Sequence, residues 1–226
     1  GFFWTMLNPL IMTGVYTLVF QFIMRVNTPN YPVFLFCALL PFNWFSESAN
    51  LGSSSVVDRP GFVRDSIFPC NILPITVIGT TMMNYIFALP ILLLALLLFK
   101  VSLGWSLLAL PIIMAVQFLF TLGIVFILAT YNVFFRDIRY IVQNIIMALF
   151  FMTPIMYDIK TVPPQFQFIF SYNPLTQLIY CYRNIFLYNS WPNWERLGWT
   201  LLISIGLVIL GAWIFETKRE SFAEHL

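Results

Sequence analysis

ILPITVIGTTMMNYIFALPILLLALLLF, residues 72–99, is followed by the link KVSLG and then by WSLLALPIIMAVQFLFTLGIVFILAT, residues 105–130. Each apolar run exceeds the roughly 20 residues that a helix needs to cross the hydrocarbon of a bilayer. So short a link makes the two runs an antiparallel hairpin. A helix satisfies its own backbone polar groups, as hydrocarbon demands, so the stretch predicts an integral membrane protein.

The composition of the whole chain agrees with this reading. Of its 226 residues 60% are hydrophobic, only 9% are charged, and the mean hydropathy is +0.87. A water-soluble domain carries about a quarter of its residues as Asp, Glu, Lys and Arg, so we expect much of the surface of this chain to be surrounded by lipid rather than by water. The net charge is +2 and the cations are scattered, so no basic stripe indicates nucleic acid as a partner.

Four further stretches extend the pattern to six spans. They are 2–24, a weaker candidate at 31–55, 140–157 and 197–215. The second carries Glu47, Asn50 and Ser53 in its latter half. Polar residues are costly against lipid, so we expect that half to face protein or a watery cavity, or to lie close to the membrane boundary.

Prolines interrupt the chain between the fifth and sixth spans. Pro154 is expected to kink or end the fifth span. Beyond it, the pairs Pro163-Pro164, Asn173-Pro174 and Trp191-Pro192 rule out one straight helix over 158–193 and favour two short re-entrant helices. The predicted fold is all-α, with six transmembrane helices plus two re-entrant helices, no internal repeat, and a single transmembrane domain over 1–226.

The usual signatures of catalysis are missing from the sequence. Cys37, Cys70 and Cys181 are odd in number and far apart, which suggests neither a disulfide framework nor a zinc site. His225 is the only histidine, and no Gly-Lys pair exists that could belong to a Walker A loop. We expect a transport protein rather than an enzyme, with no cofactor or metal bound in this chain.

Three motifs occur in order: NVFFRDI at 132–138, FFMTPIMY at 150–157 and YNPL at 172–175. In these motifs the chain resembles the polysaccharide-export permeases of type-two ABC exporters, which are the Wzm-like O-antigen and TagG-like teichoic acid families. The opening residues GFFW, with Asn8-Pro9, are similar to the family's first helix. The family's amphipathic amino-terminal interface helix normally precedes the position of Gly1, so we expect it to be missing here.

The resemblance also implies an orientation and partners. Counting Lys and Arg gives six on one side and five on the other, which decides little. The resemblance places the larger count, both termini and the loops after the second and fourth helices in the cytoplasm. It implies a homodimer in the bacterial inner membrane with two separate ATPase subunits that bind ATP and Mg. The remaining expected partners are a lipid-linked glycan and membrane lipids.

Two cytoplasmic segments are candidates for the mechanism. The first resembles the family's ATPase-coupling helix, and its candidate residues are Asp58, Arg59, Phe62, Arg64, Asp65 and Phe68. The alternative for it is an ordinary solvated loop. The second matches the family's cytoplasmic gate, with candidate residues Asn132, Phe135, Arg136, Asp137, Arg139 and Tyr140. The alternative for it is an anchor at a helix boundary, with Arg136 and Asp137 meeting partners or headgroups.

The outer end supplies the third candidate. In the family the re-entrant region closes that end, and the matching residues are Pro154, Tyr157, Asn173, Pro174, Tyr180, Tyr182 and Arg183. Aromatic rings suit stacking on sugars, and the possible channel aromatics are Phe42, Trp44, Phe45 and Tyr85, besides Tyr180 and Tyr182. The alternative is that these rings pack inside the protein or belt the membrane interface.

The function expected from sequence is export of a lipid-linked polysaccharide of the O-antigen, capsule or teichoic acid type. The main alternative is a permease of the same superfamily that moves a drug or a lipid. A polytopic glycosyl or acyl transferase would need a cluster of carboxylates or histidines at one membrane surface, which the sequence does not offer. A passive channel without an ATPase is the third alternative.

Overall fold

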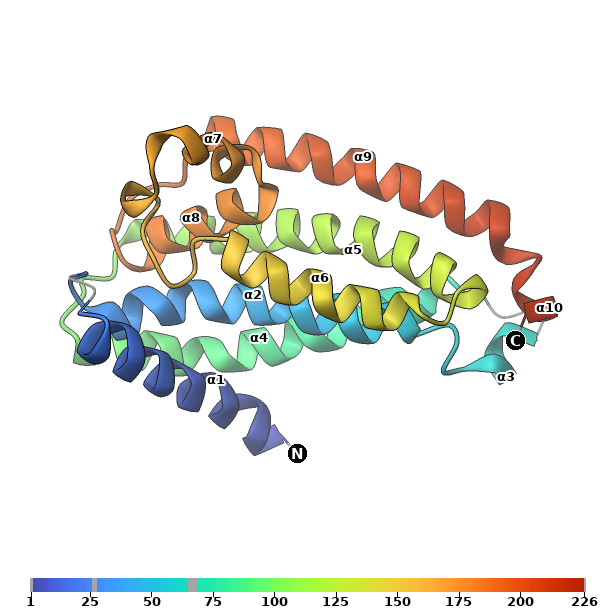
Figure 1. The fold of residues 1–226 in the computed structure, drawn as a ribbon, viewed down its shortest axis with the longest axis horizontal. Coiled ribbons are helices and arrows are strands. Elements are labelled where there is room, and N and C mark those ends of the chain that lie inside the picture. Colours follow the sequence, from blue (N-terminus) through green and yellow to red (C-terminus); the bar gives the residue numbers. More distant parts are fainter. Residues whose placement is uncertain (1, 26–27, 65–68, 226) are drawn as a thin grey trace. The chain divides into compact units, whose positions relative to one another are not determined.

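All regular structure in the computed structural model is helical across the residues that it describes, 2–25, 28–64 and 69–225 (Figure 1). The chain divides into two compact units, each made of three segments. Unit 1 comprises Gly1–Asn43, Met83–Met114 and Leu149–Leu197. Unit 2 comprises Trp44–Met82, Ala115–Ala148 and Gly198–Leu226. Several long helices contribute residues to both units.

Unit 1 combines the amino-terminal helices with the broken region that follows the fifth apolar stretch. Its elements are α1 (Phe2–Thr17), the π-helical η1 (Leu18–Ile23), parts of α2 (Tyr31–Ser54) and α4 (Ile72–Leu98), the short η2 (Trp105–Ala109) and η3 (Ile159–Thr161), α7 (Pro164–Tyr172) and α8 (Pro174–Phe186). Helix α8 contacts both α7 and η2. It is buried along most of its length, so it forms the centre of this unit.

Unit 2 is built around α5 (Leu110–Phe134). The other elements that contribute to it are α3 (Pro60–Arg64), α6 (Ile138–Met152), α9 (Trp194–Arg219), α10 (Phe222–His225) and parts of α2 and α4. The buried core includes Val125 and Phe126 of α5 together with Phe215 of α9. A Cβ added at Gly123 would lie 2.5 Å from the carbonyl carbon of Leu207, so the backbones of α5 and α9 approach closely there. Small residues allow such close approaches between membrane helices.

Three described helices are long and apolar enough to cross a membrane. They are Ile72–Leu98, Trp105–Phe134 (η2 with α5) and Trp194–Arg219. The apolar helices Pro9–Ile23 and Ile138–Met152 are shorter. An all-helical fold with several membrane helices is therefore confirmed, while the count of six spans and the re-entrant topology stay predictions.

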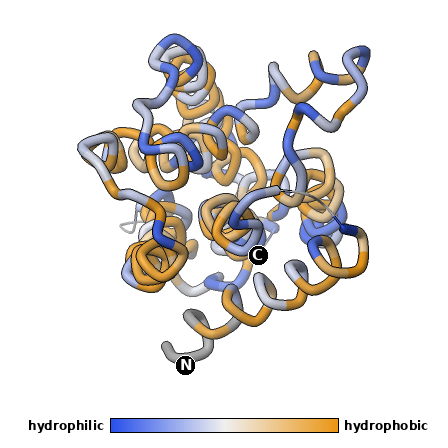
Figure 2. Tube along the Cα trace, turned by 90° about the vertical axis from the view of Figure 1, so that its left-hand side faces the viewer, coloured by the Kyte–Doolittle hydropathy of each residue, from blue (hydrophilic) through white to orange (hydrophobic). Residues whose placement is uncertain are grey.

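The outward surfaces of these helices are apolar. Trp199, Ile209 and Trp213 of α9 are all more than 60% exposed, and Leu98 of α4 is 81% exposed. Figure 2 shows hydrophobic residues along most helical turns and hydrophilic stretches in the connections. Exposed aromatic and aliphatic surface on this scale is suited to contact with lipid.

The polar half of α2 is largely buried in protein. Helix α2 continues without a break to Ser54, and Ser48 and Ser53 are completely buried. The hydroxyl of Ser48 lies 2.6 Å from that of Thr81 on α4, within unit 2. These hydroxyls therefore meet protein partners rather than lipid. The side chain of Glu47 is exposed, so it is not part of this buried set.

Candidate functional site

The first part of the candidate site lies in unit 1, where α6 ends and an irregular segment follows. Helix α6 ends at Met152, two residues before Pro154, which confirms that this proline marks the end of the helix. Proline cannot donate a backbone hydrogen bond and disfavours a helical residue before it. A helix end leaves carbonyls without intrahelical donors, and residues 153–156 are buried, so these carbonyls need donors from elsewhere.

Arg183 of α8 supplies these donors. Its Nη1 donates to the carbonyl of Pro154 at 2.7 Å and its Nη2 to that of Ile155 at 2.6 Å. Its Nε donates to the carbonyl of Phe34 on α2 at 3.4 Å. The guanidinium carbon lies 3.6 Å from the centroid of the Phe34 ring, a cation–π contact. Fully buried, this one side chain joins α8, α2 and the end of α6.

Three tyrosine hydroxyls form hydrogen bonds to the backbone in or next to the same irregular segment. The hydroxyl of Tyr31 on α2 donates to the carbonyl of Met156 at 2.9 Å. The hydroxyl of Tyr157 donates back to the carbonyl of Phe151 at 2.8 Å. The hydroxyl of Tyr180 accepts from the backbone N–H of Ile159 at 3.3 Å. The structure thus brings Pro154, Tyr157, Tyr180 and Arg183 together, and adds Tyr31 and Phe34, which the sequence analysis did not select.

Asn173 and Pro174 form the start of α8. The side-chain oxygen of Asn173 accepts from the N–H of Leu175 at 3.0 Å, and Pro174 occupies the first helical position. Both residue types favour a helix start. The Asn side chain accepts from a backbone N–H that has no partner within the helix, and Pro has no N–H that would be left without a partner. The pair therefore separates α7 from α8. Tyr182, one turn before Phe186, is completely buried.

The four proposed channel aromatics are buried within the single chain. Their exposed fractions are 4% for Phe42, 2% for Trp44, 2% for Phe45 and 3% for Tyr85. Phe42 packs on Phe150 with ring centroids 5.4 Å apart, and Tyr85 meets Tyr182 edge to face at 5.9 Å. Such packing explains why aromatic residues occupy these positions. A role of these rings in contacting sugar stays a prediction.

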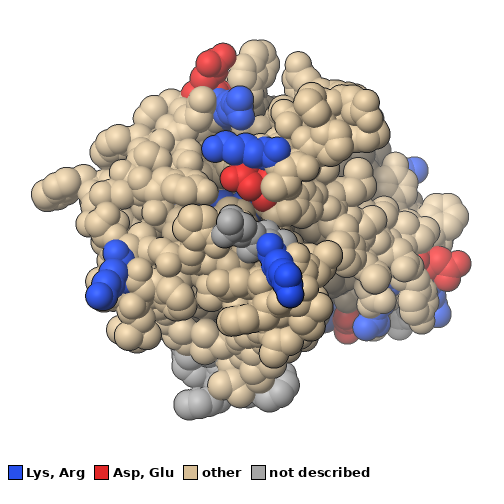
Figure 3. All heavy atoms as spheres, turned by 60° about the vertical axis from the view of Figure 1, so that its left-hand side comes forward, with Lys and Arg blue, Asp and Glu red and all other residues tan. Residues whose placement is uncertain are grey.

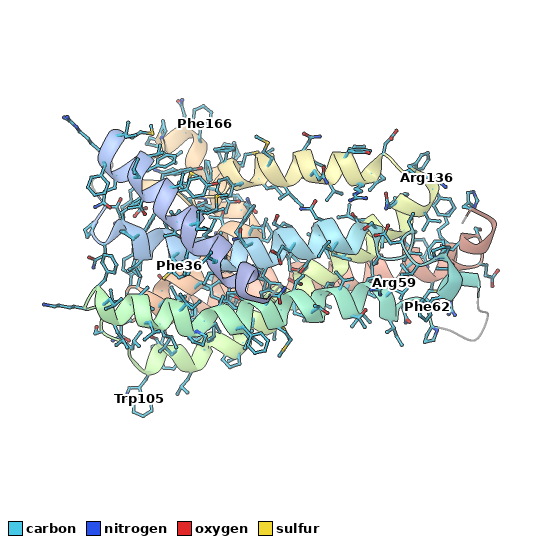
Figure 4. All side chains as sticks on the ribbon, turned by 90° about the horizontal axis from the view of Figure 1, so that it is seen from below. Phe36, Arg59, Phe62, Trp105, Arg136 and Phe166 are labelled. Carbon is cyan, nitrogen blue, oxygen red and sulfur yellow. The ribbon has the colours of Figure 1, made fainter. Side chains whose placement is uncertain are left out.

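The coupling segment lies in unit 2 and leads into α3. The hydroxyl of Ser54, at the end of α2, donates to the carboxylate of Asp58 at 2.7 Å. Pro60 begins α3, and Val63 is buried in the unit's core while Phe62 is 51% exposed. Arg59 is exposed beside Phe62 (Figure 4). Helix α3 is therefore anchored on one side and presents a cation and a ring on the other.

The remaining coupling candidates are described incompletely. Arg64 is the last residue of α3, and the structure describes its backbone only. Asp65 and Phe68 lie outside the described residues.

The predicted gate is the exposed link between α5 and α6. Phe135 and Tyr140 are 63% and 65% exposed, and Arg136, Asp137 and Arg139 are exposed as well. The Asp137 carbonyl accepts from the N–H of Tyr140 at 3.0 Å, so Asp137 lies directly before the first residue of α6, next to a helix N-terminus where a negative charge is favourable. Within the described part of the chain no ion pair joins Arg136 to Asp137. Their exposure leaves both charges available to water, headgroups or a partner.

Asn132 differs from the other gate candidates, because it is buried. It is only 3% exposed, and its side-chain oxygen has no hydrogen-bond partner among the described residues. An unsatisfied buried acceptor is costly and usually has a specific explanation. Among the described gate candidates Asn132 is therefore the buried one, and its role in a gate stays a prediction.

Helix α10 packs beside two of the candidate segments and was not predicted from the sequence. It contacts α3, and its Phe222 is completely buried. The Phe222 ring lies 6.1 Å from that of Phe134 at the end of α5 and 5.2 Å from that of Phe215. Helix α10 thus connects the coupling segment to the residue that precedes the gate link (Figure 1, Figure 4). The only signal in the sequence was one phenylalanine within a charged tail.

The described side chains do not form a cluster suited to a metal ion. On α9, Arg219 and Glu216 form an ion pair at 3.7 Å. No three His, Cys, Asp or Glu side chains of the described residues come together as metal ligands would. The described contacts are instead hydrogen bonds and aromatic packing that hold helices together.

Comparison with known proteins identifies the family. The family described as "ABC-2 type transporter" matches residues 1–187. The chain belongs to this family. The "O-antigen export system permease protein RfbA" of Myxococcus xanthus is 36% identical over all of this chain and 88% of its own length. A protein of the same name from Klebsiella pneumoniae is 32% identical over all of this chain and 87% of its own length.

A more distant relative has a different cargo in its name. The "Polysialic acid transport protein KpsM" of Escherichia coli is 21% identical over 98% of this chain and 87% of its own length. Membership of the ABC-2 transporter family, together with the apolar helices, establishes a multi-pass protein of the inner membrane with a role in transport.

Replacing Arg183 should loosen unit 1. In Arg183→Lys the ammonium keeps the charge but cannot present the planar fork that reaches two carbonyls at once. We expect a lower thermal unfolding midpoint in detergent, corresponding to roughly 1.5–3 kcal/mol for lost hydrogen bonds to a charged group. The control is Arg196→Lys, an exposed arginine of α9. Equal midpoints for the two variants would contradict the joining role of Arg183.

Proposed function

We propose that this chain is the permease subunit of an ATP-driven exporter that moves a lipid-linked polysaccharide out of the cytoplasm. The observation that carries this proposal is the similarity to O-antigen export permeases along the whole chain, at 36% and 32% identity. The name of the polysialic acid relative extends the class of cargo to capsule-type glycans. O-antigen, capsule and teichoic acid polymers all belong to the proposed substrate class.

The proposed assembly is a homodimer of permeases with two ATPase subunits. The sequence contains no Gly-Lys pair that could end a Walker A loop, so ATP and Mg are assigned to the partner subunits. In the proposed six-span topology, with both termini in the cytoplasm, α3, the link between α5 and α6, and α10 lie on the cytoplasmic side. Helices α7 and α8 are then re-entrant from the outer side.

The ATPase subunit is proposed to dock on α3. Phe62 and Arg59 are exposed there, while Val63 holds the helix to the core of unit 2. An exposed ring beside a cation is the kind of anchor that dominates protein interfaces when a partner buries it. Movement of the docked ATPase would then be transmitted to the permease through a firmly attached helix.

Helix α10 is proposed to relay that movement to the gate. It contacts α3 on one side and the Phe134 ring on the other, through Phe222 and through His225, whose ring centroid lies 4.8 Å away. Phe134 directly precedes the exposed link at 135–137. A shift of α3 therefore has a packed route to this link, of the kind that turns small displacements into helix rearrangements.

The region around Arg183 is proposed to keep the outer end closed between transport cycles. Irregular backbone at membrane depth persists only where protein satisfies it. Arg183 and Tyr31 do so for the carbonyls of residues 154–156. This arrangement supports a rigid outer closure formed by α7 and α8.

Loss of the gene should strand the polysaccharide inside the cell. Surface glycan is measured on intact cells by oxidising it with a membrane-impermeant reagent and labelling it with a hydrazide. We expect the mutant cells to lose this surface signal, while their lysates still contain lipid-linked polymer. The same strain complemented with the gene is the control. Normal surface glycan together with new sensitivity to amphiphilic drugs would instead favour the drug or lipid permease.

Two aromatic variants should separate docking from relay. Phe62→Ala removes an exposed ring, so we expect about fivefold less ATPase to co-purify, as for an interface anchor worth about 1 kcal/mol. Phe222→Leu keeps an apolar side chain in the core, so ATPase binding should persist while export per ATP hydrolysed falls. Phe168→Ala and Phe168→Leu, at a 61% exposed position of α7, are the matched controls.

The readouts are ATPase recovered on the purified permease and export measured against hydrolysis. Full ATPase recovery with Phe62→Ala would remove α3 from the docking surface. Full export per ATP with Phe222→Leu would remove α10 from the relay.

A further inference from the structure

Unit 1 contains an apolar groove beside α1 that the transport mechanism does not use. Its volume is about 440 Å³, and its walls come from α1, η1, the start of α2 and the end of α4. Ligand sites in proteins commonly measure about 300–1,000 Å³. Val33 and Phe36, exposed by only 1% and 2%, form its deep wall, and Figure 4 shows Phe36 between the ribbons of α1 and α4.

Helix α1 leaves this space open because only a narrow stripe of its described side chains is buried against the protein. Among the described side chains of α1, those buried are Pro9, Thr13 and Thr17, at intervals of four residues. Gly14, on the groove wall, has no atom within 4 Å of where a Cβ would stand. The absence of a side chain at Gly14 therefore widens the groove.

Two cations follow lining residues of the groove along the chain. Phe22 and Phe99 line the groove, and Arg25 and Lys100 come within three residues after them. Both cations are exposed, and within the described part of the chain no acid pairs with either. Both adopt left-handed backbone conformations, with φ of 54° and 55°, which a residue with a Cβ seldom takes. Figure 3 shows some Lys and Arg side chains on this end beside acidic ones and others surrounded by uncharged surface.

Two further features indicate an amphiphilic ligand. Trp105, five residues after Lys100, is 81% exposed and points away from the protein (Figure 4), as tryptophans do at the level of lipid headgroups. The hydroxyl of Thr17, 91% buried on the groove wall, has no hydrogen-bond partner among the described residues. A ligand that combines a hydrocarbon chain, ester oxygens and an anionic head would complement the groove, this hydroxyl and the cations.

We propose that the groove is a binding site for an anionic glycerophospholipid. One acyl chain lies against Val33 and Phe36, and the phosphate lies between Arg25 and Lys100. Long basic side chains extend readily toward phosphates at the membrane surface. In the topology proposed above this lipid belongs to the outer leaflet and acts as a wedge that holds α1 against α2 and α4.

Charge argues against a second copy of the chain as the occupant. A twofold interface sets the same surface against itself. If the groove lay on such an axis, each copy would add its own Arg25 and Lys100 to the same region. Like charges destabilise such an arrangement, whereas an anionic lipid neutralises them.

Photolabelling of the complete exporter tests the site. The permease with its ATPase is reconstituted in phosphatidylcholine vesicles that contain a little phosphatidylglycerol with a diazirine in one acyl chain. After irradiation, mass spectrometry should find adducts in peptides covering 10–22 and 32–36. Gly14→Leu fills the groove and should reduce these adducts several-fold. The control is Gly206→Leu, an exposed glycine of α9 with equally open surroundings, which should leave them unchanged.

Charge variants test the headgroup assignment. Arg25→Gln and Lys100→Gln should each lower the phosphatidylglycerol adducts about fivefold, as expected for about 1 kcal/mol per cation at a membrane surface. Lys160→Gln, at another exposed lysine of unit 1, should not. Equal labelling by a matched phosphatidylcholine probe would overturn the proposal. So would equal losses in Gly14→Leu and Gly206→Leu, or disulfide cross-linking of Leu18→Cys between two copies with no lipid adduct.

Discussion

Hydrocarbon cannot hydrogen-bond to a peptide carbonyl, and this constraint determines how unit 1 is built. A helix satisfies its own carbonyls, but α6 ends before Pro154 and leaves the carbonyls of Pro154 and Ile155 buried without intrahelical partners. The guanidinium of Arg183 donates to both. Its own charge is met by a third carbonyl and by the Phe34 ring. The broken helix and the buried arginine therefore require each other.

The coupling and gate candidates in unit 2 follow a different physical logic. Among the described residues their charged side chains are exposed. What connects the two segments is aromatic packing, because Phe222 of α10 contacts Phe134 at the end of α5 while α10 contacts α3. Exposed charges suit reversible contact with a partner, whereas packed rings transmit displacement because they have little room to yield.

The sequence predicted features that depend on local chemistry. Pro154 and the Asn173-Pro174 pair act on the adjacent backbone, so α6 ends near Pro154 and the chain is interrupted at Asn173-Pro174 as expected. The partners of Arg183 were beyond sequence reasoning, because Phe34 is 149 residues away and a carbonyl leaves no signature. Phe222 was missed because one apolar residue in a charged tail has no periodicity. The groove beside α1 depends on how three helices pack, which no single segment encodes.

Amide hydrogen exchange tests most directly whether Arg183 holds the broken region together. The measurement compares the wild-type protein with Arg183→Met, which keeps much of the side-chain length and removes the donors. The account predicts faster exchange in peptides covering 153–160 and 174–186, with α5 and α9 unchanged. Unchanged exchange in those two peptides, or uniform acceleration across all helices, would contradict it.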